Sequence, residues 1–302
     1  MKVAYLITAY HQPEHLARLV HALDCPWASF YVHVDAKSDI APFIDALKSG
    51  DSSSNPNIHI LGGPHRVKCY WGGFGLVRAT LNLMKASLIS KSSFSRFCLL
   101  SGSDYPIQPL EAIFKALDSK VEFLSVDRQL APKIPISHFD SRATHYHFRN
   151  PSLLRKLGLN GRIPRLRPSP LPLFVGSGWW CLTRDAVSFV LDYVCRNPDY
   201  IRWMRYFDIP DEGFIHTLVK ASTLARNISD DFENCLLHDA QHVQNVYGAH
   251  YIDWHGGGFH PKVLVEDDLP KLLRSTALFA RKLEEPVSNQ LRDSLTSTLT
   301  ST

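Results

Sequence analysis

Short apolar runs alternate with amphipathic segments through the first 130 residues of the chain. The runs are too short for helices and predict core strands. These strands lie at Val3–Thr8, Phe30–Val34, Ile58–Leu61, Phe97–Leu100 and Glu122–Val126. The segments between them repeat apolar residues at helical spacing and predict helices at His15–Leu23, Ile40–Leu47, Phe74–Ser90 and Leu110–Leu117.

This alternation predicts an α/β fold, with a mostly parallel central sheet and helices on both faces. In such sheets ligands bind beyond the carboxyl ends of the strands. Three loops leave predicted strands there and are therefore candidate binding loops: Thr8–Pro13, His33–Asp39 and Ser101–Pro106.

The pattern changes after Asp140. From Ser141 to Arg184 the chain has no acidic residue, while arginine and lysine accumulate, and the prolines of Arg162–Phe174 exclude a regular helix there. A solvated surface loop is one interpretation. The other is a loop that meets anionic groups or an anionic membrane face, and the sequence leaves both open.

Regular structure is predicted again from Gly176 to Val194, as a strand and then a helix with Thr183 near its start. A further helix is predicted at Ile209–Ser222. The stretch from Ser288 to the end is rich in serine and threonine, and we expect it to be a disordered polar tail.

Composition narrows the class of protein. Apolar residues make up 45% of the 302 residues and charged residues 21%, which is typical of a globular chain. The net charge of +4 suits anionic ligands but is far from a nucleic-acid-binding signature, so we expect no nucleic-acid partner. The first apolar run is too short to span a membrane, and six cysteines without a Cys-x-x-Cys pair favour free thiols. These features predict a cytoplasmic protein.

The motif Pro-Asp-Glu at 210–212 opens the predicted helix at Ile209–Ser222. Two acids in a first turn are explained well enough by the helix dipole. Successive helical residues point about 100° apart, however, so one of Asp211 and Glu212 can cap the helix while the other reaches outward to accept a proton.

Cations gather in the last quarter of the chain. Lys262 follows the glycine run at 256–258, and Arg281 and Lys282 come near the end of a predicted helical region. Each cation, taken alone, is explained as an ordinary solvated surface residue. Together, the three could clamp a diphosphate without a metal ion.

Other ligand-binding signatures do not fit. Gly72, Gly73 and Gly75 do not form a dinucleotide fingerprint, and the chain has no P-loop or nucleophile elbow. The histidine pairs, including His238 and His242, lack the glutamate of a zinc motif. After the strand at Phe97–Leu100 the chain reads Ser-Gly-Ser-Asp, where metal-dependent sugar-nucleotide enzymes carry Asp-x-Asp.

Taken in order, these segments resemble the core-2/I-branching β-1,6-N-acetylglucosaminyltransferases and the related peptide O-xylosyltransferases of glycosyltransferase family 14. The matching segments run from near the N-terminus to Leu283. They are YLITAYHQPEHLARLVHAL, FYVHVDAKSD, YWGGFGLVRATLNLMKASL, FCLLSGSDYPI, GSGWWCLTRDAVSFVL, PDEGFIHTL and GFHPKVLVEDDLPKLLRSTALFARKL.

The resemblance implies a GT-A-type (Rossmann-like) fold in a single domain over residues 1–287. Residues 1–130 would be the nucleotide-binding half, and residues 131–287 the acceptor and catalytic half. It further implies an inverting mechanism and a UDP-sugar donor, N-acetylglucosamine or xylose, that is bound without a divalent metal or other cofactor. The acceptor would be a hydroxyl on a glycan or glycoconjugate.

Site residues carry over by motif. Glu212 resembles the general base, and Lys262 and Lys282 resemble the diphosphate cations, with Arg281 as an alternative clamp. Thr8, His11 and Asp35 resemble positions near the nucleoside. Positions that line the sugar and acceptor cleft are Trp71, Asp104, Trp179, Trp180, Asp211 and Trp254.

The animal members of the family are membrane-anchored and disulfide-bonded, whereas this chain shows neither feature and so resembles a bacterial-type member. We expect it in the cytoplasm, with peripheral contact at the inner face of the membrane through the 141–184 stretch. The rival hypothesis is a catalytically inactive carbohydrate-binding protein that retains the fold. A decayed copy would be free to lose Glu212, Lys262 and Lys282, and all three are present.

Overall fold

The computed structural model describes residues 1–49, 57–130, 141–232, 245–255 and 260–300. Cys235, His238, His242 and the glycine run at 256–258 lie outside these ranges. Of the helices in the described ranges, none combines the length and apolar character needed to cross a bilayer.

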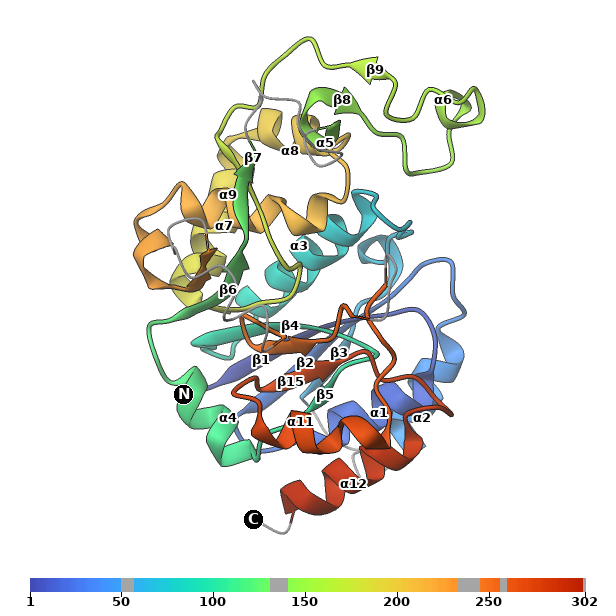
Figure 1. Cartoon of the computed structure of the whole chain (residues 1–302), viewed down its shortest axis with the longest axis vertical. Helices are drawn as coiled ribbons and strands as arrows, with labels where there is room; N and C mark the ends of the chain where they lie inside the picture. Colours follow the sequence, from blue (N-terminus) through green and yellow to red (C-terminus); the bar gives the residue numbers. More distant parts are fainter. Residues whose placement is uncertain (50–56, 131–140, 233–244, 256–259, 301–302) are drawn as a thin grey trace.

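A seven-stranded sheet forms the centre of the molecule, with the strand order β12-β6-β11-β4-β1-β2-β3 (Figure 1). The pairs β1–β2, β1–β4, β2–β3 and β6–β12 are parallel, and β11 is antiparallel to both of its neighbours. The predicted α/β class with a mostly parallel sheet is therefore confirmed. The strands are β1 (Val3–Ala9), β2 (Ala28–Val34), β3 (Ile58–Ile60), β4 (Arg96–Ser101), β6 (Glu122–Val126), β11 (Cys181–Thr183) and β12 (Ile228–Asp231).

Side chains of β1 alternate between two hydrophobic clusters, as the period of a strand requires. Tyr5 and Ile7 pack with one set of helices, while Ala4 and Leu6 pack with the other. Helices therefore cover both faces, as predicted. The first set is α1 (Pro13–Ala22), α2 (Ala41–Ser49) and α4 (Leu110–Leu117), and the second is α3 (Gly75–Leu88), α7 (Arg184–Arg196) and α9 (Phe214–Lys220).

The predicted helix over Ile209–Ser222 is interrupted. A 3₁₀ turn, η2 (Pro210–Glu212), comes first, and α9 begins only after Gly213. The start of α7 agrees with the prediction, because the Thr183 hydroxyl accepts a hydrogen bond from the Ala186 N–H at 3.3 Å. Such a side-chain cap satisfies one of the free N–H groups of the first turn.

A second, four-stranded sheet carries the C-terminal cations. It joins β5 (Tyr105–Pro106), β15 (Phe279–Arg281), β14 (His250–Ile252) and β13 (Val246–Tyr247). Arg281 thus ends a strand and not the helical region that we predicted. The apolar run Leu278–Ala280 is buried on both sides of this strand, and such a short run cannot be told from a helical segment by its pattern alone.

The expected disordered tail is wrong for Asn289–Thr300, which form the helix α12. Leu291 and Leu295 are one turn apart and are fully buried beside Leu264 and Leu272, the latter in α11 (Leu269–Arg274). Serine and threonine hydroxyls donate to carbonyls four residues earlier, for example Thr296 to Arg292 at 2.8 Å. Packing of these two leucines therefore stabilises the helix, although its polar composition predicted disorder.

Candidate active site

The three predicted loops meet at one edge of the central sheet. Thr8 pairs with Ser101 on one side and His33 on the other. The Gly102 N–H donates to the Thr8 carbonyl, and the Asp35 N–H to the Ala9 carbonyl, each at 2.8 Å. Because β2 and β4 lie on opposite sides of β1, the strand order reverses here, and this is where open α/β sheets bind ligands.

Asp104 is fully buried behind this edge. Its carboxylate accepts hydrogen bonds from the Ser101 N–H at 2.8 Å and the Ser101 hydroxyl at 2.6 Å. Burial alone would raise its pKa, but Arg281 and His250 outweigh burial and hold the pKa of Asp104 below its usual value. We predicted that Asp104 lines the sugar cleft. The structure corrects this, because the carboxylate is 0% exposed and acts as a counter-charge inside the fold.

Arg281 is the cation that Asp104 faces, with its Nη1 at 3.8 Å from Asp104 Oδ1. The guanidinium stacks over the Trp179 ring, 4.0 Å from the ring centroid. Its Nε and Nη1 are buried and have no hydrogen-bond partner among the described residues, and burial lowers its pKa. Buried guanidinium nitrogens normally find acceptors, so this group is prepared for an additional anion.

The two predicted lysines lie on neighbouring segments, since the Leu264 N–H donates to the Lys282 carbonyl at 2.9 Å. Each is already paired. Lys262 Nζ lies 2.7 Å from Asp268 Oδ1, which raises the pKa of Lys262, and Lys282 Nζ contacts Glu284. A diphosphate would therefore have to compete with a carboxylate at each lysine, whereas two nitrogens of Arg281 are free of hydrogen bonds within the described residues.

The predicted nucleoside residues surround the ends of β1 and β2. Asp35 is buried, and its Oδ1 accepts the Lys37 N–H at 2.9 Å. His11 stacks on the exposed Tyr10 ring at 4.1 Å and lies 3.8 Å from Glu284. Burial lowers the pKa of His11. Tyr10 was not among the predicted site residues, although it lies in the candidate binding loop between Thr8 and His11.

The η2 turn presents two carboxyl groups beside the sheet. The Gly176 N–H donates to the Glu212 carbonyl at 2.9 Å, and a Cβ on Gly176 would lie 1.9 Å from the Ser125 carbonyl oxygen, so only glycine fits between β6 and the turn. Burial raises the pKa of Glu212 to about 7 and that of Asp211 to about 6. Both groups can thus exchange protons near neutral pH.

Arg142, from α5 (Ser141–Thr144), holds Glu212 in place. Its Nη1 donates to Glu212 Oε2 at 2.8 Å and opposes the rise of the Glu212 pKa. Arg142 and Arg281 both lower the pKa of Asp211, which places the carboxyl pair within electrostatic reach of the Arg281 centre. Sequence reasoning missed Arg142. The only available signal was the acid-free stretch to which it belongs.

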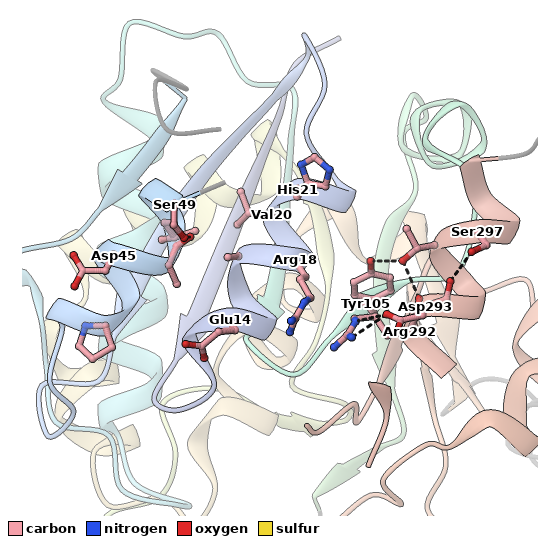
Figure 2. A pocket seen from close by; sticks show the side chains of 15 residues that line it. Glu14, Arg18, Val20, His21, Asp45, Ser49, Tyr105, Arg292, Asp293 and Ser297 are labelled. Carbon is pink, nitrogen blue, oxygen red and sulfur yellow. Dashed lines mark hydrogen bonds and ion pairs between the residues drawn. The ribbon is translucent and has the colours of Figure 1, made fainter. Parts of the chain in front are cut away.

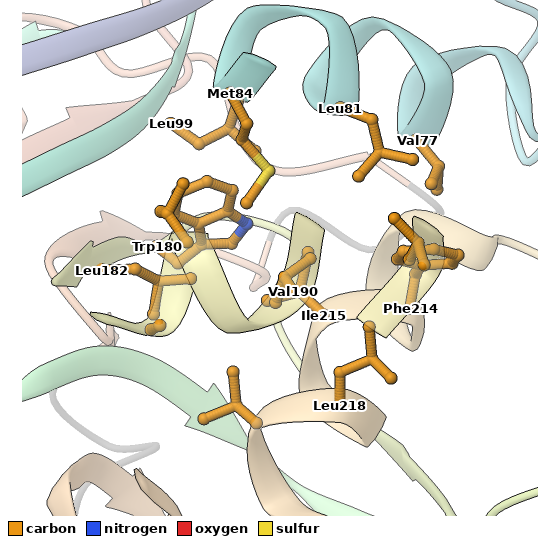
Figure 3. Packing of buried hydrophobic residues seen from close by; sticks show 14 of the residues in the cluster. Val77, Leu81, Met84, Leu99, Trp180, Leu182, Val190, Phe214, Ile215 and Leu218 are labelled. Carbon is orange, nitrogen blue, oxygen red and sulfur yellow. The ribbon is translucent and has the colours of Figure 1, made fainter. Parts of the chain in front are cut away.

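The predicted tryptophans separate into two groups. Trp71 is 54% exposed, and the Arg149 guanidinium lies 5.1 Å from its ring. Trp254 is also exposed. The ring of Trp179 stacks against the Arg281 guanidinium. Trp180 is 1% exposed, so its predicted place in the cleft is wrong. It packs among Met84, Leu99 and Leu182 (Figure 3). Adjacent residues of an extended chain point to opposite sides, and here only Trp179 points to the site.

Trp71 is tied to the η2 turn through the backbone. The Ile209 N–H donates to the Gly72 carbonyl at 3.1 Å, and Ile209 has a φ of 51°, directly before η2. Arg149 holds Asp208 with two hydrogen bonds, at 2.6 and 2.8 Å. Arg149 and the Ile209–Gly72 hydrogen bond therefore link the exposed Trp71 to the segment that bears the two carboxyl groups.

Two further features bear on ligand binding. Within the ranges that the structure describes, no group of three or more histidine, cysteine, aspartate or glutamate residues is placed to hold a metal ion. A large groove of about 880 Å³ lies between α1, α2 and α12 (Figure 2). Charges of both signs, such as Arg18 and Asp45, line it, and it contains none of the predicted site residues.

Comparison with known proteins gives the family. The family model described as Core-2/I-Branching enzyme matches residues 3–275. A xylosyltransferase of Ciona intestinalis is 26% identical over 96% of this chain and 33% of its own length. The human β-1,3-galactosyl-O-glycosyl-glycoprotein β-1,6-N-acetylglucosaminyltransferase 3 is 25% identical over 95% of this chain and 65% of its own. The chain thus spans between a third and two thirds of these relatives.

Among solved structures, the galactosyltransferase LgtC in complex with donor and acceptor sugar analogs matches 100% of this chain and 97% of its own, with a TM-score of 0.41 and 10% identity. Mouse xyloside xylosyltransferase 1 matches 92% of this chain and 97% of its own, with a TM-score of 0.37 and 12% identity. The fold is established by the strand order and packing of the chain itself.

Proposed function

The chain belongs to the Core-2/I-branching enzyme family, and from this premise we propose that it is an inverting glycosyltransferase. It moves N-acetylglucosamine or xylose from a UDP-sugar to a hydroxyl group on a glycan or glycoconjugate. The names of its relatives support this substrate class, because they transfer xylose or β-1,6-linked N-acetylglucosamine.

One observation carries the proposal. A carboxyl pair with a pKa near neutral shares one site with a buried cation, two of whose nitrogens have no hydrogen-bond partner in the described part of the chain. Glu212, with a pKa of about 7, lies beside Asp211, which is in the field of Arg281. Group transfer from a nucleotide sugar needs both, a base for the incoming alcohol and positive charge for the leaving diphosphate.

The reaction uses these groups as follows. Glu212 takes the proton of the acceptor hydroxyl as its oxygen attacks the anomeric carbon. The bond from that carbon to UDP breaks on the opposite face, and its electron pair leaves with the diphosphate. Arg281 meets the negative charge that develops there, which stabilises the transition state more than the ground state. Base assistance of this kind is typically worth about 10²–10⁴-fold in rate.

Metal independence is part of the proposal. Arg281, with Lys262 and Lys282 once they leave their carboxylate partners, supplies the charge that a divalent ion supplies elsewhere. No cofactor is required. To bind the donor, Lys262 and Lys282 must give up their ion pairs with Asp268 and Glu284. Within the described residues, Arg281 has no such pair to break at its Nε, so it makes the first contact with the phosphates.

The other predicted residues take supporting roles. Thr8, His11 and Asp35 hold the nucleoside at the ends of β1 and β2. Trp71, Trp179 and Trp254 offer apolar ring faces for sugars and exclude water from the donor. Asp211 sets the charge around Glu212. Residues 1–130 remain our predicted nucleotide-binding half.

The test measures UDP released from UDP-N-acetylglucosamine and UDP-xylose with a panel of glycan acceptors, in the presence of EDTA. Transfer should persist in EDTA, and Glu212→Gln should abolish it while calorimetric UDP binding is retained. Glu111→Gln, at an exposed site on α4, is the matched control and should keep full activity.

Complete loss of activity in EDTA would overturn metal independence, and an active Glu212→Gln enzyme would remove Glu212 from the role of base. Tight sugar binding without any UDP release from either donor would favour the rival hypothesis of an inactive carbohydrate-binding protein.

A further inference from the structure

We propose that residues 147–167, which we call the arm, dock on an anionic lipid surface. The arm leaves the body after β8 (His145–Tyr146), carries the short helix α6 (Leu153–Lys156) and returns through β9 (Ile163–Pro164). In Figure 1 it extends beyond the rest of the molecule, with α6 at its far end. This proposal goes beyond the proposed activity and does not depend on it.

The arm exposes large aliphatic side chains, both at its tip around α6 and after β9. Leu153 is 70% exposed, Leu157 62% and Leu166 92%, and Leu154 is also exposed. Single exposed leucines are common, but several of them on one projecting segment indicate a contact surface. Buried in the interfacial region of a bilayer, these side chains would leave water without disturbing the fold.

The charge of the arm selects the partner. No acidic residue occurs between Ser141 and Arg184, and Lys156, Arg162 and Arg167 are exposed among the leucines. Leucines beside lysine and arginine match a surface with acyl chains below and negative headgroups above. A second copy of this chain would present the same cationic arm and be repelled, and a nucleic acid would leave the leucines in water.

The base of the arm is firmly built. The Arg165 guanidinium lies 3.9 Å from the Trp203 ring centroid and 5.2 Å from that of Tyr146, and Nη1 donates to the Trp203 carbonyl at 2.9 Å. The Phe148 N–H donates to Asn160 Oδ1 at 2.7 Å, and the Gly161 N–H to the Tyr146 carbonyl at 3.0 Å. The tip is thus presented in a fixed orientation, so little ordering opposes docking.

The arm also adjoins the candidate active site. Arg149, inside the arm, holds Asp208, four residues before Glu212, and Arg142 just before the arm holds Glu212 itself. The root of the arm therefore contacts the residues that support the η2 turn.

The test is co-sedimentation of the full chain with vesicles. We expect binding to phosphatidylcholine–phosphatidylglycerol vesicles, weakening as salt rises, and little binding to pure phosphatidylcholine. Leu153→Ser/Leu157→Ser and Lys156→Glu/Arg162→Glu should each lower the partition coefficient at least about tenfold. Ile89→Ser/Lys91→Glu, which changes an equally exposed isoleucine and lysine outside the arm, should bind as the wild type.

The proposal is overturned if the wild type does not sediment with anionic vesicles, if the arm variants bind unchanged, or if the control variant loses as much binding as they do. An arm variant that changes the molar mass in analytical ultracentrifugation, without vesicle binding by the wild type, would assign the arm to contact between copies instead. Calorimetric UDP binding by every variant separates this result from any failure of the proposed transferase activity.

Discussion

The β4 edge around Asp104 and the η2 turn around Asp211 both hold an aspartate in the field of Arg281, but they affect it in opposite ways. At β4, Arg281 and His250 outweigh the effect of burial, Ser101 adds two hydrogen bonds, and the pKa of Asp104 falls. At η2, burial raises the pKa of Asp211 to about 6, because its own N–H, Arg142 and Arg281 offset only part of the desolvation.

The difference lies in the charges and donors around each carboxylate, because burial raises the pKa of both groups and is outweighed only at Asp104. Asp104 is fixed in its charged form and serves the fold. Asp211 and Glu212 have pKa values near the pH at which a proton can be gained or lost, as the proposed chemistry requires. Three changes test this contrast.

The largest effect is expected at the β4 edge. Asp104→Asn keeps the shape of the side chain but leaves Arg281 buried without its counter-charge, and breaking a buried pair in this way costs about 3 kcal/mol or more. Urea unfolding measures this loss. Asp267→Asn, at an exposed carboxylate, should change the free energy of unfolding by less than about 0.5 kcal/mol. Equal midpoints for the two variants would contradict the structural role of Asp104.

Arg142→Met should change the pH dependence of transfer. The guanidinium lowers the pKa of Glu212, so its loss raises that pKa above about 7. If the pKa rises by one unit, kcat/KM at pH 7 falls about fivefold and recovers as the pH approaches 9. Arg142→Lys should restore part of the profile, and Arg202→Met, which removes an exposed pair with Asp199, should not alter it. A loss that is equal at all pH values would show that Arg142 acts otherwise.

The smallest effect is expected from Asp211→Asn on stability. A carboxyl group whose pKa is raised in the folded state stabilises the fold at low pH, and this contribution is lost as the pH rises from about 4 in the unfolded chain to about 6 in the folded one. The variant should therefore be more stable than the wild type at pH 8, by on the order of 1 kcal/mol, and not at pH 4. Thermal unfolding at both pH values measures this difference, and a variant that is destabilised at pH 8 would contradict it.

Local patterns were sufficient for β1, β2, β3, β4 and β6 of the central sheet, whereas β12 was not predicted. The apolar runs that predicted β1, β2 and β4 are long enough to be distinguished from helices, and parallel pairing then brings Thr8, Asp35 and Ser101 to one edge. The motif around Glu212 was also visible, because acids at the start of a helical segment are local signals.

Contacts between distant segments could not be predicted in this way. Arg142 reaches Glu212 across 70 residues of sequence, and no local pattern encodes that pair. Trp180 is buried while the adjacent Trp179 stacks on Arg281, and this difference depends on which side of the chain faces the core. In α12, two leucines stabilise the helix only by packing against residues that lie elsewhere in the sequence.

Ile209 connects the loop of Trp71 to η2. A φ of 51° is unfavourable for a β-branched residue and costs on the order of 1–3 kcal/mol, so it is kept only while surrounding contacts hold it. The hydrogen bond to Gly72 is one of those contacts. If the Trp71 loop moved, Ile209 would lose this hydrogen bond, and relaxation of its backbone would shift the adjoining η2 turn that bears Asp211 and Glu212.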